Sequence, residues 1–400
     1  MPPTATTHQH TVPASRRPLA TGSGGAPGGA RRRVPLSLRK AAPALLGYVV
    51  VRLFVLLVLA RWAHVQGRGL WPTLAATWDS RWYVGIADHG YQQELGTALD
   101  SNNLAFFPLY PVLVKAVAAV TPGTHASVAL AIAVVASLVA AWGVFAVGDL
   151  LHGRRTGTVL AVLWAATPVG VVQWMGYTES LFTACTAWAF YTGLRNRWLW
   201  AGSLAALAGL TRPTGIAVAA AVVLAGLVAY ARSRDRRALA GALLAPLGWA
   251  GYVGWVGLRI GRWDGYFAVQ KLWRNEWDGG RETLRQLRRQ LAEDATPTLY
   301  LVLVSFILLL SVGLFLLCLA DRQPLLLLVF SGVLLAVVLG SGGVYFPRAR
   351  FLMPAFPLLL PIALAVGRAR RAVVALVLGG AVLSSAWFGA YLLLVWSGPP

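Results

Sequence analysis

A carboxylate set among aromatic side chains is the feature of this sequence best suited to chemistry. Asp79 stands between Trp78 and the neighbouring residues Trp82 and Tyr83. Aromatic faces stack on sugar rings, and a carboxylate partly removed from water accepts a proton more readily, so it can act as a general base. The segment is therefore typical of a site that deprotonates a sugar hydroxyl. The alternative is a belt of interfacial aromatic residues with Asp79 as a helix cap.

Three further polar clusters interrupt the apolar parts of the chain. Their sequences are Tyr177-Thr178-Glu179-Ser180, Thr211-Arg212-Pro213-Thr214-Gly215 and Phe346-Pro347-Arg348-Ala349-Arg350-Phe351. Arginine offers phosphate a fixed fork of donors, although a single arginine at a membrane face is more often a headgroup anchor. Glu179 opens an apolar run, where it also suits the helix dipole. Because the clusters fall on one expected face, we predict that Arg350, Arg212 and Arg348 bind a donor phosphate.

The elements that must position these residues are membrane helices. Of the 400 residues, 57% are hydrophobic and only 12% are charged, which is too little charge to cover a water-facing surface. This composition excludes a soluble enzyme, a disordered protein and a disulfide scaffold. The net charge of +21 could suggest nucleic-acid binding, but in a membrane protein excess arginine is usually an orientation signal, so no nucleic-acid partner is expected. Cys185 and Cys318 lie in apolar runs and indicate neither metal nor disulfide.

The apolar runs predict an all-α polytopic membrane protein with about eleven transmembrane helices. Residues 1–40 are expected to form a disordered, basic cytoplasmic tail, and residues 41–400 the transmembrane domain. The expected spans are residues 43–62, 125–148, 156–174, 178–194, 198–214, 216–231, 238–257, 298–320, 324–341, 352–367 and 372–396.

Arginine placement predicts the orientation of these spans. The short loops on the side of the tail hold twelve arginines and three acidic residues, which places them in the cytoplasm. The two long loops, about residues 63–124 and 258–297, then lie on the outer face with the polar clusters. Residues 106–120 are expected to be interfacial or re-entrant. Within the second loop, Leu284, Leu287 and Leu291 recur at helical spacing beside arginines, which predicts an interfacial helix.

Five motifs in order give the chain a specific resemblance over about residues 45–360. They are Trp-Asp-x-x-Trp-Tyr from Trp78, Phe-Phe-Pro-Leu-Tyr-Pro from Phe106, Tyr-Thr-Glu-Ser-Leu-Phe from Tyr177, Thr-Arg-Pro-Thr-Gly from Thr211, and Arg-Phe-x-x-Pro-x-x-Pro from Arg350. The order resembles the GPI mannosyltransferase II family (phosphatidylinositol-glycan class V). The resemblance implies the GT-C glycosyltransferase fold with an outward active site. It also implies inverting, metal-independent transfer of mannose from a polyprenyl- or dolichyl-phosphate, without a cofactor.

The resemblance also implies roles for individual residues. Asp79 matches the acidic residue of the first outer loop and becomes the candidate base, Glu179 matches the second acidic motif, and Arg212 and Arg350 match motif arginines. The expected sugar or acceptor contacts are Trp78, Trp82, Tyr83, Asp88, His89, Tyr110 and Tyr177. The basic tail departs from the family pattern, and the acceptor is expected to be a lipid-linked molecule or a protein.

Two other classes compete with this interpretation. A secondary transporter or lipid flippase usually keeps ionisable residues within the membrane and shows two repeated halves. Here the apolar runs hold almost no charge away from their ends except Arg52, and no repeat is visible. A scaffold would not explain carboxylates clustered with aromatic residues. The sequence therefore predicts a multi-pass mannosyltransferase of the plasma membrane that acts at the extracytoplasmic face, in biosynthesis of cell-envelope glycolipids.

Overall fold

The computed structural model describes residues 38–400. Residues 1–37 of the predicted tail therefore lie outside the described residues. Residues 38–40, which the sequence assigned to that tail, form the start of helix α1 (Leu38–Val65). Within the described part, the regular elements are helices, and the only bridge between extended segments joins Trp277 to Ser341. The prediction of an all-α membrane protein is confirmed.

Among residues 38–400, six helices are long and apolar enough to cross a membrane. They are α1, α5 (His125–His152), α9 (Gly215–Ser233), α10 with α11 (Arg236–Leu244 and Leu247–Ile260), α14 (Leu299–Ala320) and α18 (Arg371–Leu394). The helix is the form in which a chain satisfies its own backbone groups in lipid, and about 20 residues cross a bilayer core.

The other five predicted spans are helical but shorter. They correspond to α6 (Arg154–Ala165), α7 (Glu179–Leu194), α8 (Trp198–Gly209), α15 (Leu325–Gly340), and η4 with α17 (Phe356–Leu359 and Leu360–Arg368). The total of eleven spans therefore stays a prediction.

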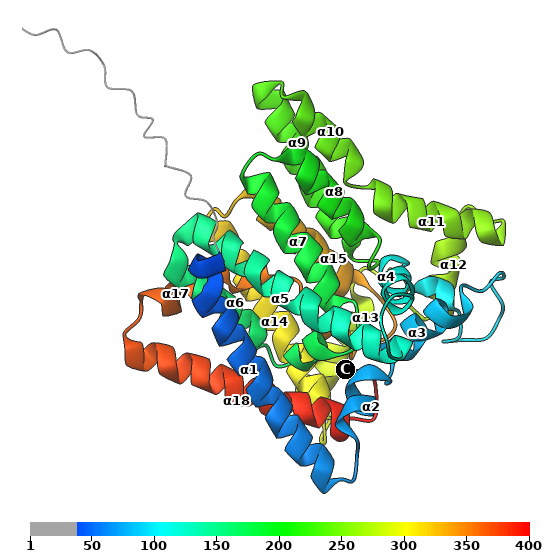
Figure 1. Cartoon of the computed structure of the whole chain (residues 1–400), viewed down its shortest axis with the longest axis horizontal. Coiled ribbons are helices and arrows are strands. Elements are labelled where there is room, and N and C mark those ends of the chain that lie inside the picture. The colour runs from blue at the N-terminus through cyan, green and yellow to red at the C-terminus, as the bar shows by residue number, and fades with distance from the viewer. Residues whose placement is uncertain (1–37) are drawn as a thin grey trace, which may run out of the picture. The chain divides into compact units, whose positions relative to one another are not determined.

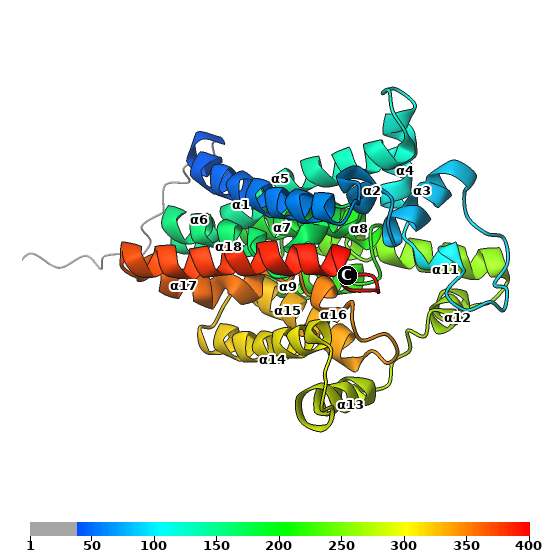
Figure 2. The same ribbon diagram turned by 90° about the horizontal axis from the view of Figure 1, so that it is seen from below.

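Short helices gather at one end of the long ones, as Figures 1 and 2 show. They are α2 (Leu70–Ala75), α3 (Asp79–His89), α4 (Leu109–Ala118), α12 (Gly265–Leu272) and α13 (Arg281–Arg288). Two helical turns join them, η1 (Asn103–Ala105) and the π-type turn η3 (Arg289–Glu293). The ten residues of α4 rise only about 15 Å, half of a bilayer core, so α4 is too short to cross it.

A break between α6 and α7 positions one part of the site. Pro168 cannot continue α6, and the chain passes through the turn η2 (Gly170–Trp174) before α7 begins. The side chain of Arg52, buried in α1, donates hydrogen bonds to the carbonyls of Ala165 and Gly170. It thereby satisfies carbonyl groups that the helix end leaves without partners. The one charge that the sequence places within an apolar run therefore caps a broken helix.

Close backbone contacts hold the next helices together. A Cβ atom at Gly241 of α10 would lie 2.2 Å from the carbonyl oxygen of Trp198, and one at Gly248 of α11 would lie 1.9 Å from that of Ala206. Only glycine permits this approach, which is the usual way that helices pack in lipid. The contacts fix α10 and α11 against α8, directly before the loop that carries Arg212.

Candidate active site

Two carboxylates and two guanidinium groups meet at the end of the bundle where the short helices gather. Asp79 is the first residue of α3, Glu179 is the first residue of α7, Arg212 follows α8, and Arg350 lies on the four-residue helix α16 (Arg348–Phe351). Arg350 places Nη2 2.8 Å from Asp79 Oδ2 and Nε 3.3 Å from Glu179 Oε1. Arg212 Nη1 forms an ion pair with the same Glu179 oxygen. The structure therefore joins the predicted base to three other predicted site residues.

Hydrogen bonds of Thr178 close this cluster into a ring. Arg212 Nη1 donates to Thr178 Oγ1 over 3.1 Å, and the hydroxyl groups of Thr178 and Tyr83 lie 3.2 Å apart. Tyr83 stands one helical turn after Asp79 on α3, so the ring returns to the element where it began. Because each link fixes the next, the position of the Asp79 carboxylate depends on all four segments of the chain.

Burial separates the two carboxylates. The side chain of Glu179 is 1% exposed, whereas that of Asp79 is 23% exposed. A group that touches an acceptor hydroxyl must be reachable, so Asp79 is the carboxylate suited to act as base. Glu179 lies between two arginines, a position that suits it to hold their guanidinium groups, and its predicted catalytic role stays a prediction.

The protonation states of Tyr83, Tyr177 and Arg350 further favour Asp79 as the candidate base. Burial raises the pKa of Tyr83 and of Tyr177 above the ordinary range, so both phenols stay neutral. Burial also lowers the pKa of Arg350, but attraction by Asp79 and Glu179 outweighs it and raises that pKa overall. Arg350 is therefore a permanent cation. Its buried Nη1 has no hydrogen-bond partner among residues 38–400.

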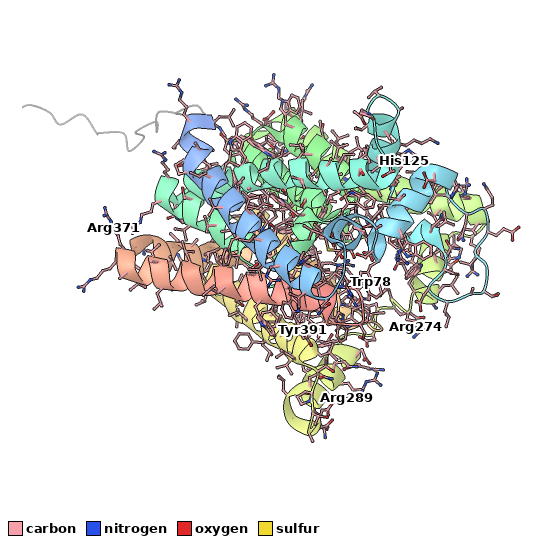
Figure 3. All side chains as sticks on the ribbon, turned by 60° about the horizontal axis from the view of Figure 1, so that its bottom comes forward. Trp78, His125, Arg274, Arg289, Arg371 and Tyr391 are labelled. Carbon is pink, nitrogen blue, oxygen red and sulfur yellow. The ribbon has the colours of Figure 1, made fainter. Side chains whose placement is uncertain are left out.

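A groove of 890 Å³ runs along the outward face of α3, beside the Asp79 end of that helix. Its walls include the aromatic residues Trp78, Trp82, Tyr91 and Trp396, and the basic residues Arg68, Arg81 and His89. In Figure 3, Trp78 lies near the end of α18 that carries Tyr391, whereas Arg371 marks the opposite end. The groove thus opens where two candidate spans, α1 and α18, end. Three of the predicted contacts, Trp78, Trp82 and His89, line it.

The residue directly before Asp79 has an unusual backbone. Trp78 has φ 52° and ψ −123°, a combination in the positive-φ region that a bulky residue rarely adopts. Such strain persists only where the surroundings enforce it, and it is frequent at functional sites. Here it lets Trp78 face the groove while Asp79 begins the helix and faces Arg350.

Three predicted site residues, Arg348, Asp88 and Tyr110, belong neither to the cluster nor to the groove. Arg348 is almost fully buried and donates to Thr283 of α13 and to the carbonyl of Ser341, so it fastens the second long loop, and phosphate binding by Arg348 stays a prediction. Arg348 and Arg350 stand two positions apart on a helix and therefore point in different directions. Asp88 lies nine residues after Asp79, two and a half helical turns, and pairs with His125 at the start of α5.

Tyr110 is the third of these residues, and its environment makes it structural. It is fully buried, its hydroxyl donates to the carbonyl of Ala129 over 2.6 Å, and its ring packs edge-on against Tyr83 at 5.2 Å. It therefore anchors α4 to α5 and supports Tyr83 from behind. Tyr177 does not line the groove on α3 either. The centre of its ring lies 5.0 Å from the guanidinium carbon of Arg350, so Tyr177 belongs to the cluster.

Sequence reasoning missed Thr178, Arg68, Arg81 and Trp396. Thr178 adjoins Glu179 in a motif already singled out, so its hydroxyl could have been considered as a ligand of a nearby arginine. No local pattern connects Arg68 or Trp396 with α3, because they come from the ends of α1 and α18. Within residues 38–400 no three His, Cys, Asp or Glu side chains come together, and metal-independent transfer stays a prediction.

Comparison with known proteins places this geometry in a family context. Residues 107–252 match the family model of dolichyl-phosphate-mannose-protein mannosyltransferases. Together with the relatives described next, this match confirms the predicted resemblance to the GPI mannosyltransferase II family. The matched segment contains Glu179 and Arg212, whereas Asp79 and Arg350 flank it.

Two curated proteins are similar in sequence to part of this chain. The chain is 30% identical over 149 residues to GPI alpha-1,6-mannosyltransferase 2 of Rattus norvegicus and, to the same extent, to that of Mus musculus. These alignments cover 35% of this chain but only 29% of each relative. The chain thus matches less than a third of the length of these relatives.

The archaeal oligosaccharyltransferase AglB from Archaeoglobus fulgidus, solved with an inhibitory peptide and a dolichol-phosphate, has a similar structure. The TM-score is 0.52 at 14% identity, over 88% of this chain and 56% of AglB. At this identity the likeness concerns the fold alone, and the chain has the GT-C fold. Together with its apolar helices, this makes it an integral membrane protein.

Proposed function

We propose that this protein transfers mannose from a polyprenyl-phosphate-mannose donor to a hydroxyl of an acceptor, at the extracytoplasmic face of the plasma membrane. The observation that carries the proposal is the contact between Asp79 and Arg350, a partly exposed carboxylate beside a buried permanent cation. Support comes from the mannosyltransferase match and from the dolichol-phosphate bound to AglB, whose fold this chain shares.

The proposed reaction is a single displacement. The acceptor hydroxyl attacks the anomeric carbon from the face opposite the phosphate, Asp79 takes the hydroxyl proton, and the lipid phosphate leaves with its bonding electron pair. Arg350 stabilises the charge on the departing phosphate, and Arg212 holds Glu179, which in turn orients Arg350. Inversion needs no second carboxylate as nucleophile, unlike a retaining glycosidase. Glu179 is accordingly free to serve as a positioning residue.

The groove on α3 is the proposed acceptor site. Trp78 and Trp82 offer flat apolar faces to a sugar ring, while Arg68, Arg81 and His89 offer donors. No carboxylate belongs to the groove lining, so the lining favours an acceptor that carries negative charge. Because the groove opens at the ends of α1 and α18, we propose a lipid-linked acceptor in preference to a protein.

A second, apolar groove is the proposed path of the donor's isoprenoid chain. It has a volume of 610 Å³ and lies along α5, between α4 and the start of α7. Val128, Ile132, Val135 and Val139 form one wall, at the spacing of a single helix face. Leu181 and Ala184 of α7 also line it, so the groove runs beside the helix that begins at Glu179.

The experiment that tests the proposal is transfer from a synthetic polyprenyl-phosphate-mannose by purified protein, with Asp79→Asn as the decisive variant. General-base assistance contributes about 10²–10⁴-fold in rate, so Asp79→Asn should lose at least 10²-fold while keeping its fold and donor binding. Asp88→Asn is the matched control, because Asp88 lies on the same helix but outside the cluster, and it should keep nearly full turnover. Turnover of Asp79→Asn within about threefold of wild type would refute Asp79 as the base.

A further inference from the structure

We propose that Arg350 masks the base Asp79 in the resting enzyme, and that the donor phosphate unmasks it by drawing the guanidinium away. The inference rests on the proposed function and adds an order to it: donor first, deprotonation second. Its geometrical basis is that one cation, Arg350, contacts both carboxylates of the cluster.

A masked carboxylate is a poor base. While Arg350 Nη2 lies 2.8 Å from Asp79 Oδ2, the guanidinium occupies the side of that oxygen that an acceptor hydroxyl would have to approach. Proton abstraction from an acceptor would then be slow before a donor is present.

The surroundings let Arg350 leave Asp79 without stranding another charge. Glu179 keeps a second partner, Arg212, when Arg350 moves. Asp79 is the more exposed carboxylate and can be solvated. Arg350 already has one unpartnered donor, Nη1, to offer an incoming phosphate oxygen.

Aromatic rings keep the cation in place during this exchange. The guanidinium carbon of Arg350 lies 5.0 Å from the ring centre of Tyr177 and 5.4 Å from that of Phe351. A guanidinium that contacts ring faces can turn its fork of donors while remaining in the same space. A small rotation would therefore exchange the carboxylate of Asp79 for a phosphate.

Charge balance gives the inference a measurable consequence. The resting cluster holds two negative and two positive charges, and a phosphodiester adds one negative charge. The titratable and charged groups that face Asp79 from the packed elements are Tyr83, Tyr177, Glu179, Arg212 and Arg350. Both phenols already hold their protons and Glu179 retains Arg212, so Asp79 is the group expected to take up a proton when the phosphodiester binds.

The test is proton uptake on binding of a donor mimic that cannot react. Citronellyl methyl phosphate is a suitable probe, because a phosphodiester does not itself titrate between pH 5 and 7. Calorimetric titration of the purified full chain, in buffers of different ionisation enthalpy, gives the number of protons bound per ligand. We expect wild type to take up a growing fraction of a proton as the pH falls from 7 to 5.

Variants show which group takes up the proton, and they distinguish a failure of the masking role from a failure of the proposed function. Asp79→Asn should bind the diester without uptake, and Asp79→Ser repeats the measurement if the asparagine variant does not fold. Arg289→Gln, in an exposed arginine of η3 that Figure 3 labels, should behave as wild type. Binding to wild type without uptake, or equal uptake by Asp79→Asn, would overturn the masking role alone. If wild type does not bind the diester at all, the donor site of the proposed function is refuted, and the masking role is refuted with it.

Discussion

Glu179 offers the most direct test of the charged cluster, because replacing it by glutamine removes a buried charge while keeping the side chain's shape. Its carboxylate is 1% exposed and has two guanidinium partners, Arg350 and Arg212. The variant Glu179→Gln leaves both arginines buried with a single carboxylate, Asp79, to balance them. We expect a large loss of stability from this one substitution.

The size of the loss follows from the distances and the burial. At 3.3 Å and an effective dielectric constant of about 20, the attraction between Glu179 and Arg350 is about 5 kcal/mol before desolvation is subtracted. Desolvation offsets much of that gain in the intact pair, but removal of one partner leaves the other charge uncompensated. Measured cases of this kind lose about 3–5 kcal/mol, and the near-complete burial of Glu179 requires no discount for solvent screening.

The assay is unfolding of the purified protein by dodecyl sulfate in mixed micelles, followed by circular dichroism. Glu94→Gln, at an exposed position of the first long loop, is the matched control and should stay within about 0.5 kcal/mol of wild type. The double variant Glu179→Gln/Arg212→Gln restores the charge balance and should recover at least about half of the loss. A loss below about 1 kcal/mol in Glu179→Gln, or a double variant as unstable as the sum of its parts, would refute the reasoning.

Three further outcomes are expected. Arg348→Gln should speed tryptic cleavage within residues 258–297 and leave donor KM unchanged, because Arg348 fastens that loop; a raised KM would return it to the phosphate site. Tyr83→Phe removes the hydroxyl contact with Thr178 and should lower stability by about 0.5–1.5 kcal/mol, while Asp79→Asn should lower turnover far more; the opposite order in turnover would contradict the ring. Tags at Gly96 and Arg154 should report the outer face and the cytoplasm respectively, and labelling from the same side would contradict the orientation.

The residues of the site could be predicted better than their contacts. Residue type marked Asp79, Glu179, Arg212 and Arg350, because charge is rare in an apolar chain and these residues fall beside expected spans. Because successive spans cross the membrane in opposite directions, the predicted topology placed these four residues on the same face. Which arginine pairs with which carboxylate depends on the residues at which helices begin and end, and the sequence does not fix these residues. Helix α7, for example, begins at Glu179, one residue after the start of the predicted span.

The predicted site residues that lie away from the cluster and the groove do so for one physical reason, which is that side-chain direction depends on helix phase. In the sequence Arg348 and Arg350 form one basic motif, but side chains two positions apart on a helix point in different directions. Asp88 reads as part of the same aromatic segment as Asp79, but lies on another face of α3. Tyr110 carries the right chemistry for a sugar contact, yet α4 packs that side against α5. Motifs thus located the site, and only the structure showed which members face it.

The cluster also constrains how the enzyme is made. Its members emerge from the ribosome in the order Asp79, Glu179, Arg212, Arg350, and the last one comes from α16, after almost the whole chain has entered the membrane. Until then Glu179 can be neutralised only by Arg212, and Asp79 has no partner in the cluster. The charges balance only when α16 reaches α3 and α7, so the cluster is completed late in synthesis. A nascent or prematurely terminated chain that lacks α16 would hold both carboxylates of the cluster but only one of its two arginines.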